Sequence, residues 1–110
     1  MTFEAFDVVV VPFPFTDLDA GKRRPALAVS NKTFNETHAV VVLAMITSAA
    51  NAGWPSDVLI TDLASAGLSA ESVMRMKLFT LDRALIQRKI GRLGKRDRTA
   101  VAKMARTHIF

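Results

Sequence analysis

The first half of the chain alternates short apolar runs with polar segments. Residues 7–15 begin with an acid and four valines and contain Pro12 and Pro14. Because β-branched side chains favour extended backbone, this run predicts a strand. Because proline donates no backbone hydrogen bond, the strand should lie at a sheet edge or lose its pairing at its end. The turn-forming residues 16–23 predict a loop.

Two more apolar runs, at residues 24–30 and 39–46, predict the second and third strands, and the polar residues 31–38 predict a turn between them. The third strand is apolar on both faces, so we expect it at the centre of the sheet. Residues 47–56 have the composition of a loop, and residues 57–61 predict a short fourth strand.

The second half predicts one short helix and two more strands. Asp62 can cap a single helical turn that ends at Gly67, since glycine is the residue type most favoured just after a helix. Residues 72–77 and 85–90 predict the fifth and sixth strands, with Asp82 near the turn between them.

A longer helical pattern follows near the C-terminus. The spacing of Val101, Met104, Ala105 and Ile109 predicts one amphipathic helix. Six short strands and a closing helix predict a mainly β protein built as a small barrel. A length of 110 residues is typical of one domain, so we expect a single domain over residues 1–110.

Composition excludes several classes of protein. The chain has no cysteine, which excludes disulfides, thiolate metal sites and a cysteine nucleophile, and suits a reducing compartment. Residues 1–5 do not resemble a signal peptide. The longest apolar runs, at 8–15 and 39–46, are shorter than the roughly twenty residues that a membrane-spanning helix needs. We therefore expect a cytoplasmic protein with no membrane span.

Charge is distributed unevenly along the chain, whose formal net charge is +5. Residues 1–70 carry four basic against seven acidic residues, a balance of −3, and residues 71–110 carry eleven against three, a balance of +8. A basic segment of this kind favours nucleic acid as a ligand, because binding phosphates releases condensed counterions. A solvated helix face explains residues 95–106 equally well.

The sequence does not indicate a metal or nucleotide cofactor. His38 and His108 are far apart in the chain, the acidic residues are scattered singly, and the five glycines form no nucleotide-binding pattern. Surface or partly buried positions explain both histidines. A histidine-centred catalytic triad therefore has little support.

Six segments of the chain form a specific ordered set. They are VVVVPFPFTD at residues 8–17, KRR at 22–24 followed by PALAVS, MITS at 45–48, DVLITDLASAGL at 57–68, SVMRMKLFTLD at 72–82 and IGRL at 90–93. Together they cover nearly the whole chain and resemble the MazF/PemK family of toxin endoribonucleases from toxin–antitoxin systems. The resemblance implies a small SH3-like barrel, as in MazF, PemK and CcdB, usually paired as a homodimer.

The same resemblance implies an activity and partners. It implies cleavage of single-stranded RNA, such as mRNA, without a metal, through attack of the ribose 2′-hydroxyl on the adjacent phosphate. It also implies a small acidic antitoxin, whose disordered tail occupies the RNA groove and relieves growth inhibition. We therefore expect three partners, namely RNA, a cognate antitoxin and a second copy of the chain.

Two residues match the catalytic positions of the family. Arg24 matches the arginine of its Arg-Pro pair, and a guanidinium, which stays charged and forks onto two oxygens, suits stabilisation of a phosphoryl group. Thr47 matches the Thr or Ser at the end of the third strand and can donate a hydroxyl hydrogen bond to the phosphate. A surface charge beside a strand and an ordinary strand-end cap are the alternatives for these two residues.

Further side chains are candidate RNA contacts by their chemistry. Cationic and hydroxyl groups contact phosphates, and exposed aromatic rings stack on unpaired bases. We expect such contacts from Lys22, Arg23, Ser48, Arg75, Lys77, Phe15 and Trp54. For the basic residues a solvated surface position is the alternative. For Phe13, packing in the core or at an interface is favoured over stacking.

The chain departs from the family at two places. Some members carry an Asp-Gln pair and an arginine where this chain has Met76, Lys77 and Phe79, so a carboxylate base at that position is missing here. Phe6 stands before Asp7, where the family commonly has glycine, and this difference concerns a turn.

Two other functions are compatible with a small barrel. A CcdB-type toxin, which inhibits gyrase, acts through a C-terminal tail that contains tryptophan, whereas this chain ends in Thr-His-Ile-Phe at residues 107–110. A catalytically inert barrel that binds RNA or protein would use the same arginines as the ribonuclease.

A homodimer needs a self-complementary apolar surface. The C-terminal helix and the first strand are the candidates for it. We expect the contact to use part of a set formed by Val101, Met104, Ile109, Phe110 and the strand edge with Pro12 and Pro14.

Overall fold

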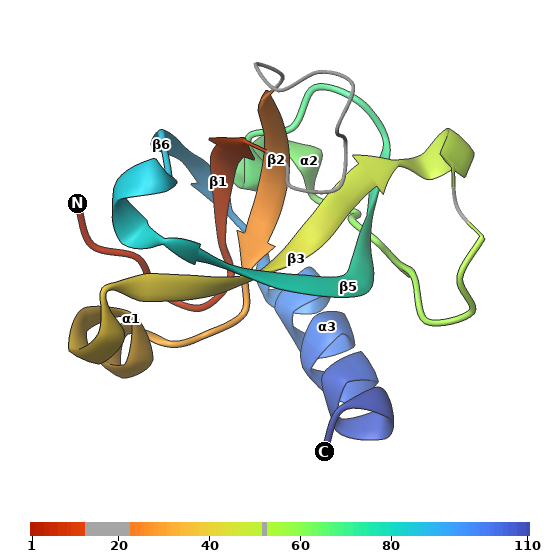
Figure 1. Ribbon diagram of the computed structural model, residues 1–110. Helices are drawn as coiled ribbons and strands as arrows, with labels where there is room; N and C mark the ends of the chain where they lie inside the picture. Colours follow the sequence, from red (N-terminus) through yellow and green to blue (C-terminus); the bar gives the residue numbers. More distant parts are fainter. Residues whose placement is uncertain (13–22, 52) are drawn as a thin grey trace.

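Six antiparallel strands form one curled sheet in the computed structural model, which describes residues 1–12, 23–51 and 53–110 (Figure 1). The strands are β1 (Asp7–Pro12), β2 (Arg23–Ala28), β3 (Val40–Ser48), β4 (Val58–Leu59), β5 (Ser72–Asp82) and β6 (Arg88–Arg92). Their order across the sheet is β4-β5-β3-β2-β1-β6. The sheet curls into a half-barrel, which confirms the predicted mainly β, barrel-like fold.

Short helical elements accompany the sheet. In the described part of the chain they are α1 (Lys32–His38), α2 (Leu63–Ala66) and α3 (Lys95–His108), with 3-10 turns η1 (Ala49–Asn51) and η2 (Arg83–Leu85). The predicted helical turn and C-terminal helix are α2 and α3. No helix within the described ranges is long and apolar enough to span a membrane.

β3 occupies the centre of the sheet, as its apolar faces predict. It pairs with β2 on one side and with β5 along its whole length on the other, and Leu43 and Ile46 are buried. The strand runs two residues further than predicted, because Ser48 still pairs with Ser72 of β5. The following loop is correspondingly shorter than expected.

β1 lies inside the sheet and loses its pairing at its end, which is the second of the two arrangements that its prolines predict. It pairs with β2 on one side and with β6 on the other. Pro12 is tolerated because pairing with β6 stops at Val10, and Pro12 lies opposite Arg23 at the last position of the β2 ladder. The edges of the sheet are β4 and β6. Residues 13–15 of the predicted strand lie outside the described residues.

α1 forms where the sequence predicts only a polar turn. Asn31 caps this helix by accepting a hydrogen bond from the Phe34 backbone N–H at 2.9 Å. Asn35 is buried, and its Nδ2 donates to the Phe3 carbonyl oxygen at 3.0 Å. Because Phe3 is distant in the sequence, local composition could not predict this stabilising contact.

The last two strands also differ from their predicted bounds. β5 continues to Asp82 because Phe79 and Leu81 pack against buried residues on that face of the sheet. η2 replaces the start of the predicted sixth strand, and β6 begins at Arg88. Asp82 does mark the turn, as predicted, since its side chain accepts a hydrogen bond from the Ala84 N–H at 2.8 Å.

α2 has the two caps that the sequence predicts. The Asp62 carboxylate accepts a hydrogen bond from the Ser65 N–H at 3.0 Å, and Gly67 follows the helix with φ 73°. A Cβ on Gly67 would lie 2.0 Å from the Ile90 carbonyl oxygen. Glycine is therefore required both by its backbone angle and by the close approach of β6.

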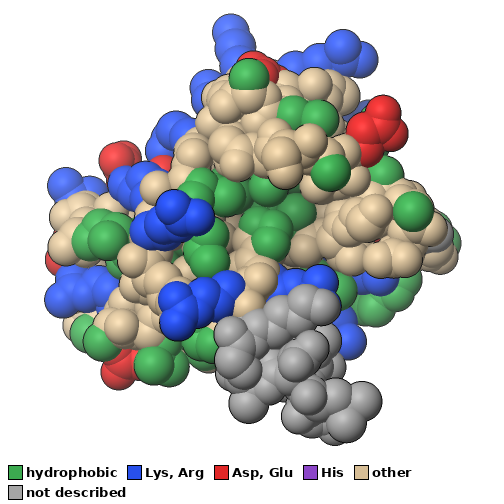
Figure 2. All heavy atoms as spheres, turned by 90° about the horizontal axis from the view of Figure 1, so that it is seen from above, with side chains coloured by type: hydrophobic (Ala, Val, Ile, Leu, Met, Phe, Trp, Pro, Cys, Tyr) green, Lys and Arg blue, Asp and Glu red, His purple; other side chains and the backbone are tan. Residues whose placement is uncertain are grey.

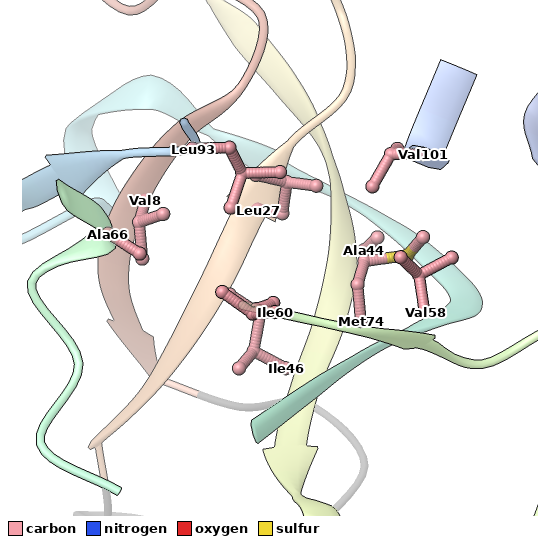
Figure 3. Close-up of a cluster of buried hydrophobic side chains, with 10 residues drawn as sticks. All are labelled: Val8, Leu27, Ala44, Ile46, Val58, Ile60, Ala66, Met74, Leu93 and Val101. Carbon is pink, nitrogen blue, oxygen red and sulfur yellow. The ribbon is translucent and has the colours of Figure 1, made fainter. Parts of the chain in front are cut away.

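Buried side chains gather on both faces of the sheet. Successive residues of β1 alternate between two clusters, with Val8 in one and Val9 in the other. The first cluster joins the sheet to α2 and α3 and contains Val8, Leu27, Ala44, Ile46, Val58, Ile60, Ala66, Met74, Leu93 and Val101 (Figure 3). The second contains Phe3, Val9, Val11, Ala26, Ala28, Val41, Leu43 and Ile86. Burial on both faces explains why the strands are continuous apolar runs.

A buried carboxylate ties the start of α3 to the connection between β4 and α2. Asp97 accepts hydrogen bonds from the Thr61 hydroxyl at 2.7 Å and from the backbone N–H groups of Thr61 and Asp62, each at 3.0 Å. Burial opposes ionisation of Asp97. The hydrogen bonds from Asp62 and Thr61, with the nearby Arg96, outweigh that burial and hold the pKa of Asp97 below its ordinary value.

Candidate functional site

The start of β2 and the end of β3 meet at one end of the half-barrel. Arg24 from β2 and Thr47 and Ser48 from β3 line one cavity of about 230 Å³. Residues 68–72, which connect α2 to β5, line the same cavity. The two strands are antiparallel neighbours, so β2 begins beside the place where β3 ends.

A second cavity, of about 560 Å³, adjoins the first. It is lined by Val10, Arg23, Arg24, Pro25, Gly67, Leu68, Ser69, Gln87, Arg88 and Ile90. Arg24, Pro25, Leu68 and Ser69 line both cavities, so the two adjoin, and we call them together the Arg24 groove. Figure 2 views the molecule from above, where β2 begins, and shows several Lys and Arg side chains around apolar side chains on that face.

Arg24 is half-buried in the wall of the groove. Its Nε is buried and has no hydrogen-bond partner among the described residues. A buried N–H donor is costly to leave unpaired, and charge-assisted bonds to anionic oxygens are among the strongest that a guanidinium makes. The position of Arg24 therefore suits a phosphate in the groove.

The hydroxyls of Thr47 and Ser48 at the end of β3 accept hydrogen bonds from the η1 segment. The Asn51 side chain donates to Thr47 Oγ1 at 3.4 Å, and the Ala50 N–H donates to Ser48 Oγ at 3.2 Å. Both hydroxyl oxygens act as acceptors in these contacts. Each hydroxyl hydrogen can therefore be donated to another group, such as a phosphate oxygen.

Arg75 has a different environment, although the sequence predicts a phosphate contact for it as well. Its Nε and one terminal nitrogen donate to the two Asp57 carboxylate oxygens at 3.0 and 2.8 Å, and that terminal nitrogen also donates to the Asn51 carbonyl oxygen at 2.8 Å. The hydrogen bond from Arg75 is the main cause that lowers the pKa of Asp57, and the same bond raises the pKa of Arg75. Arg75 lines neither cavity of the Arg24 groove.

Trp54 lies on the loop between η1 and β4, beside Arg75. Its side chain is 44% exposed, and the Arg75 guanidinium carbon lies 5.3 Å from the centre of its ring. The Trp54 backbone N–H donates to an Asp57 carboxylate oxygen at 3.2 Å. Trp54 thus has an exposed ring that faces one member of a mostly buried ion pair and a backbone that is bonded to the other.

The structure groups only part of the predicted site. Arg23 joins Arg24 in the groove and is exposed at the start of β2, whereas Lys77 is half-buried on β5 and lines neither cavity. Lys22 and Phe15 lie outside the described residues.

Several polar residues of the groove, Ser69 and Ser72 among them, were not among the predicted site residues. Glu71 lines the same cavity as Arg24 and Thr47, and Gln87 and Arg88 line the adjoining one. The basic C-terminal third of the sequence includes Arg88, but the charge pattern does not indicate which of its basic residues lies beside Arg24. Within the described ranges, no group of three or more His, Cys, Asp or Glu residues could hold a metal ion.

Several solved structures have this fold. An endoribonuclease in complex with its cognate antitoxin, from a mycobacterial species, aligns with a TM-score of 0.75 and 17% identity over 96% of this chain and 92% of that one. MazF from Deinococcus radiodurans aligns with a TM-score of 0.74 and 21% identity over 97% and 96%. A MazE–MazF structure from the same organism gives 0.71 and 22% over 97% and 95%. A comparison with curated protein sequences gives no match.

These likenesses define the chain as a small SH3-like barrel of the kind found in MazF. A family model described as the PemK-like, MazF-like toxin of type II toxin–antitoxin systems matches residues 4–109. The chain belongs to this toxin family, which confirms the resemblance seen in its sequence.

Proposed function

We propose that this chain is the endoribonuclease toxin of a toxin–antitoxin pair, a single domain that cleaves single-stranded RNA in the Arg24 groove. The observation that carries the proposal is the cavity lined together by Arg24, Thr47 and Ser48. One strand supplies a cation with an unpaired buried donor, and its neighbour supplies two hydroxyls. Membership of the toxin family supports the same function.

In the proposed reaction the ribose 2′-hydroxyl attacks the adjacent phosphorus and loses its proton. The bond from phosphorus to the 5′-oxygen breaks, the 5′-oxygen takes up a proton from water, and a 2′,3′-cyclic phosphate forms. Negative charge develops on the nonbridging oxygens during the attack, where preorganised donors are most effective. Arg24 stabilises this charge, Thr47 donates its hydroxyl hydrogen to the same phosphate, and Ser48 binds beside it.

Glu71 is the proton acceptor in this proposal. Among the described residues it is the carboxylate that lines the cavity of Arg24 and Thr47. A carboxylate can accept the proton of the 2′-hydroxyl, whereas an arginine, which stays charged, cannot. Glu71 thereby takes the role that we assign, in some family members, to a carboxylate at the positions of Met76 and Lys77 on β5.

The rest of the groove binds the RNA backbone. Arg23 and Arg88 line the larger cavity and bind phosphates that flank the scissile one. Lys22, Lys77 and Phe15 remain predicted RNA contacts. Because Arg24 supplies the positive charge at the scissile phosphate, we propose that cleavage needs no metal ion.

The test is incubation of the purified protein with end-labelled RNA in excess chelator. The expected products end in a 2′,3′-cyclic phosphate or its hydrolysis product. A matched RNA with one 2′-deoxy sugar at the scissile position should resist cleavage there. Cleavage of that RNA at the deoxy position would mean that water is the nucleophile, and would overturn the mechanism.

The proposed partner is a small antitoxin with an acidic tail that competes with RNA for the Arg24 groove. Residues 71–110 carry a balance of +8, from eleven basic against three acidic residues. The related structures of MazE–MazF and of an endoribonuclease with its cognate antitoxin support an antitoxin partner. Competition titrations should show mutually exclusive binding that weakens steeply with salt, and a ternary complex would contradict this arrangement.

A second copy of the chain is the other proposed partner. An apolar groove of about 350 Å³ is lined by Phe6, Val29, Ser30, Val42, Met76, Leu78, Val101, Ala102, Ala105, Arg106, Ile109 and Phe110. Ile109 is 47% and Phe110 85% exposed, whereas Val101 and Met104 belong to the chain's own core or pack against it. We place the contact at the exposed end of α3, because β1 is paired on both sides within the sheet. Light scattering should show a dimer, and Ile109→Asp should favour the monomer.

A further inference from the structure

We infer that Arg75 is a positioning residue that fixes residues 53–57 before β4, so that Trp54 offers one ring face to an unpaired base of the substrate. This inference rests on the proposed function and names a specificity element beside the same site. It gives Arg75 a role that differs from the phosphate contact predicted from the sequence. We call Arg75, Asp57, Asn51 and Trp54 together the Arg75 clamp.

The first step is the ion pair. The Arg75 and Asp57 side chains are only 12% and 7% exposed, and the guanidinium forks onto both carboxylate oxygens. Such paired geometry is stronger and more specific than a single contact, and it occupies the Nε and one terminal nitrogen of Arg75. The guanidinium is therefore already committed to a carboxylate of its own chain.

The second step is the loop that this pair holds. Asp57 also accepts from the Gly53 and Trp54 backbone N–H groups at 3.2 Å each, and Arg75 donates to the Asn51 carbonyl oxygen. Asn51, Gly53 and Trp54 are thus all bonded to one ion pair. The Asn51 side chain in turn donates to the Thr47 hydroxyl, so the clamp is connected to the proposed catalytic group.

The third step is the exposed ring. The guanidinium lies 5.3 Å from the centre of the Trp54 ring, close enough for a cation–π contact, while almost half of the side chain stays exposed. Every base has a flat π face, and aromatic side chains in single-strand binders stack on it. We therefore propose that a base beside the scissile phosphate stacks on Trp54. This stacking requires the Arg75 clamp, because the clamp holds the ring in place.

The test measures RNA binding. The two roles of Arg75, positioning residue and phosphate contact, predict opposite effects of Asp57→Asn on the affinity for RNA. If Arg75 is a positioning residue, Asp57→Asn should weaken binding of a 2′-deoxy-blocked RNA by about tenfold, the size of one lost stacking contact. If Arg75 contacts a phosphate instead, the same change should not weaken binding, because it removes a negative charge. Arg75→Lys should do the same, since lysine keeps the charge but cannot fork. The double variant should bind no more weakly than either single variant.

Two readouts separate a lost stack from a lost phosphate contact. Trp54 is the only tryptophan in the chain, so quenching of its fluorescence by RNA reports on stacking directly. The salt slope of binding should stay unchanged in Asp57→Asn and in Arg75→Gln, whereas loss of one phosphate contact lowers it by about 0.7 for a single strand. Arg88→Gln should show this lower salt slope, because Arg88 is a proposed phosphate contact, and it serves as the comparison. Arg83→Gln, which breaks the exposed pair with Glu36, is the neutral control.

The outcomes distinguish the clamp from the proposed function. Unchanged or tighter binding by Asp57→Asn, or a lower salt slope for Arg75→Gln, makes Arg75 a phosphate contact and overturns the clamp alone. Wild-type protein that neither binds nor cleaves RNA overturns the proposed function and the clamp with it. Circular dichroism and thermal unfolding identify a variant that fails to fold, in which case Trp54→Ala, which leaves the ion pair intact, must lose the same tenfold in binding.

Discussion

Arg24 and Arg75 are arginines on strands of one sheet, but the structure surrounds them differently. Arg24 lines a groove, and its buried Nε has no partner among the described residues. Arg75 donates three hydrogen bonds to its own chain and covers part of Trp54. Arg75 is structural because the Asp57 carboxylate pairs with it. Arg24 stays available for a ligand because no carboxylate among the described residues is bonded to it.

This contrast teaches that the number of basic residues does not measure a nucleic-acid site. A guanidinium that is already paired contributes little additional charge to a passing phosphate, because its field is largely cancelled by the partner acid. An unpaired one contributes its full charge. The comparison can be tested by changing each arginine and measuring both activity and stability.

The largest effect should come from Arg24. Arg24→Ala should lower the rate of RNA cleavage by about 100-fold or more, the usual cost of removing a preorganised donor to a developing anion. Quantitative cleavage of end-labelled RNA measures this, with Arg83→Ala as the control at an exposed ion pair. Cleavage within a factor of two of the wild type would remove Arg24 from the mechanism.

Stability should respond in the opposite sense at the two arginines. Arg75→Met should lower the free energy of unfolding by about 1–3 kcal/mol, because it leaves the mostly buried Asp57 carboxylate without its partner. Arg24→Met should leave stability unchanged or raise it, since it removes an unpaired buried donor. Urea unfolding followed by circular dichroism gives both values. Equal destabilisation by the two changes would contradict the contrast.

The hydroxyl and carboxylate beside Arg24 should have smaller effects on activity. Thr47→Ala and Glu71→Gln should each lower the cleavage rate by about tenfold or more, with unchanged thermal unfolding, because both residues lie at the cavity wall and contribute little packing. Glu71→Gln should also flatten the acid limb of the rate against pH. A full acid limb in that variant would assign the proton acceptor to another group.

The smallest effect should be the dependence of stability on acid pH. Asp57 and Asp97 have pKa values held below their ordinary value, so they bind protons less readily in the folded than in the unfolded chain. Their stabilisation is present above the unfolded pKa of about 3.9 and is lost as pH falls through the folded value. Unfolding measured between pH 6 and roughly pH 3 should show this loss. Asp57→Asn should reduce this loss of stability at acid pH, because it removes the carboxylate that pairs with Arg75. A steeper loss in that variant would contradict the lowered pKa of Asp57.

Much of the fold could be predicted because its signals are local. Asp62 and Gly67 act within a single helical turn, and the apolar run of β3 predicts a central strand by itself. The end of β5 and the helix α1 could not be predicted in the same way. Their stabilising contacts come from residues far away in the sequence, such as Phe3 against Asn35.

The candidate site divides in the same manner. The sequence by itself determined the barrel, the family resemblance and the choice of Arg24 and Thr47, because residue types at ordered spacings carry that information. Only the tertiary structure decided that Glu71 and Arg88 line the groove, and that Asp57 neutralises Arg75 across 18 residues of chain. The reason is physical: the charge that an arginine offers to a ligand depends on which acids lie within hydrogen-bonding distance, and folding sets those distances.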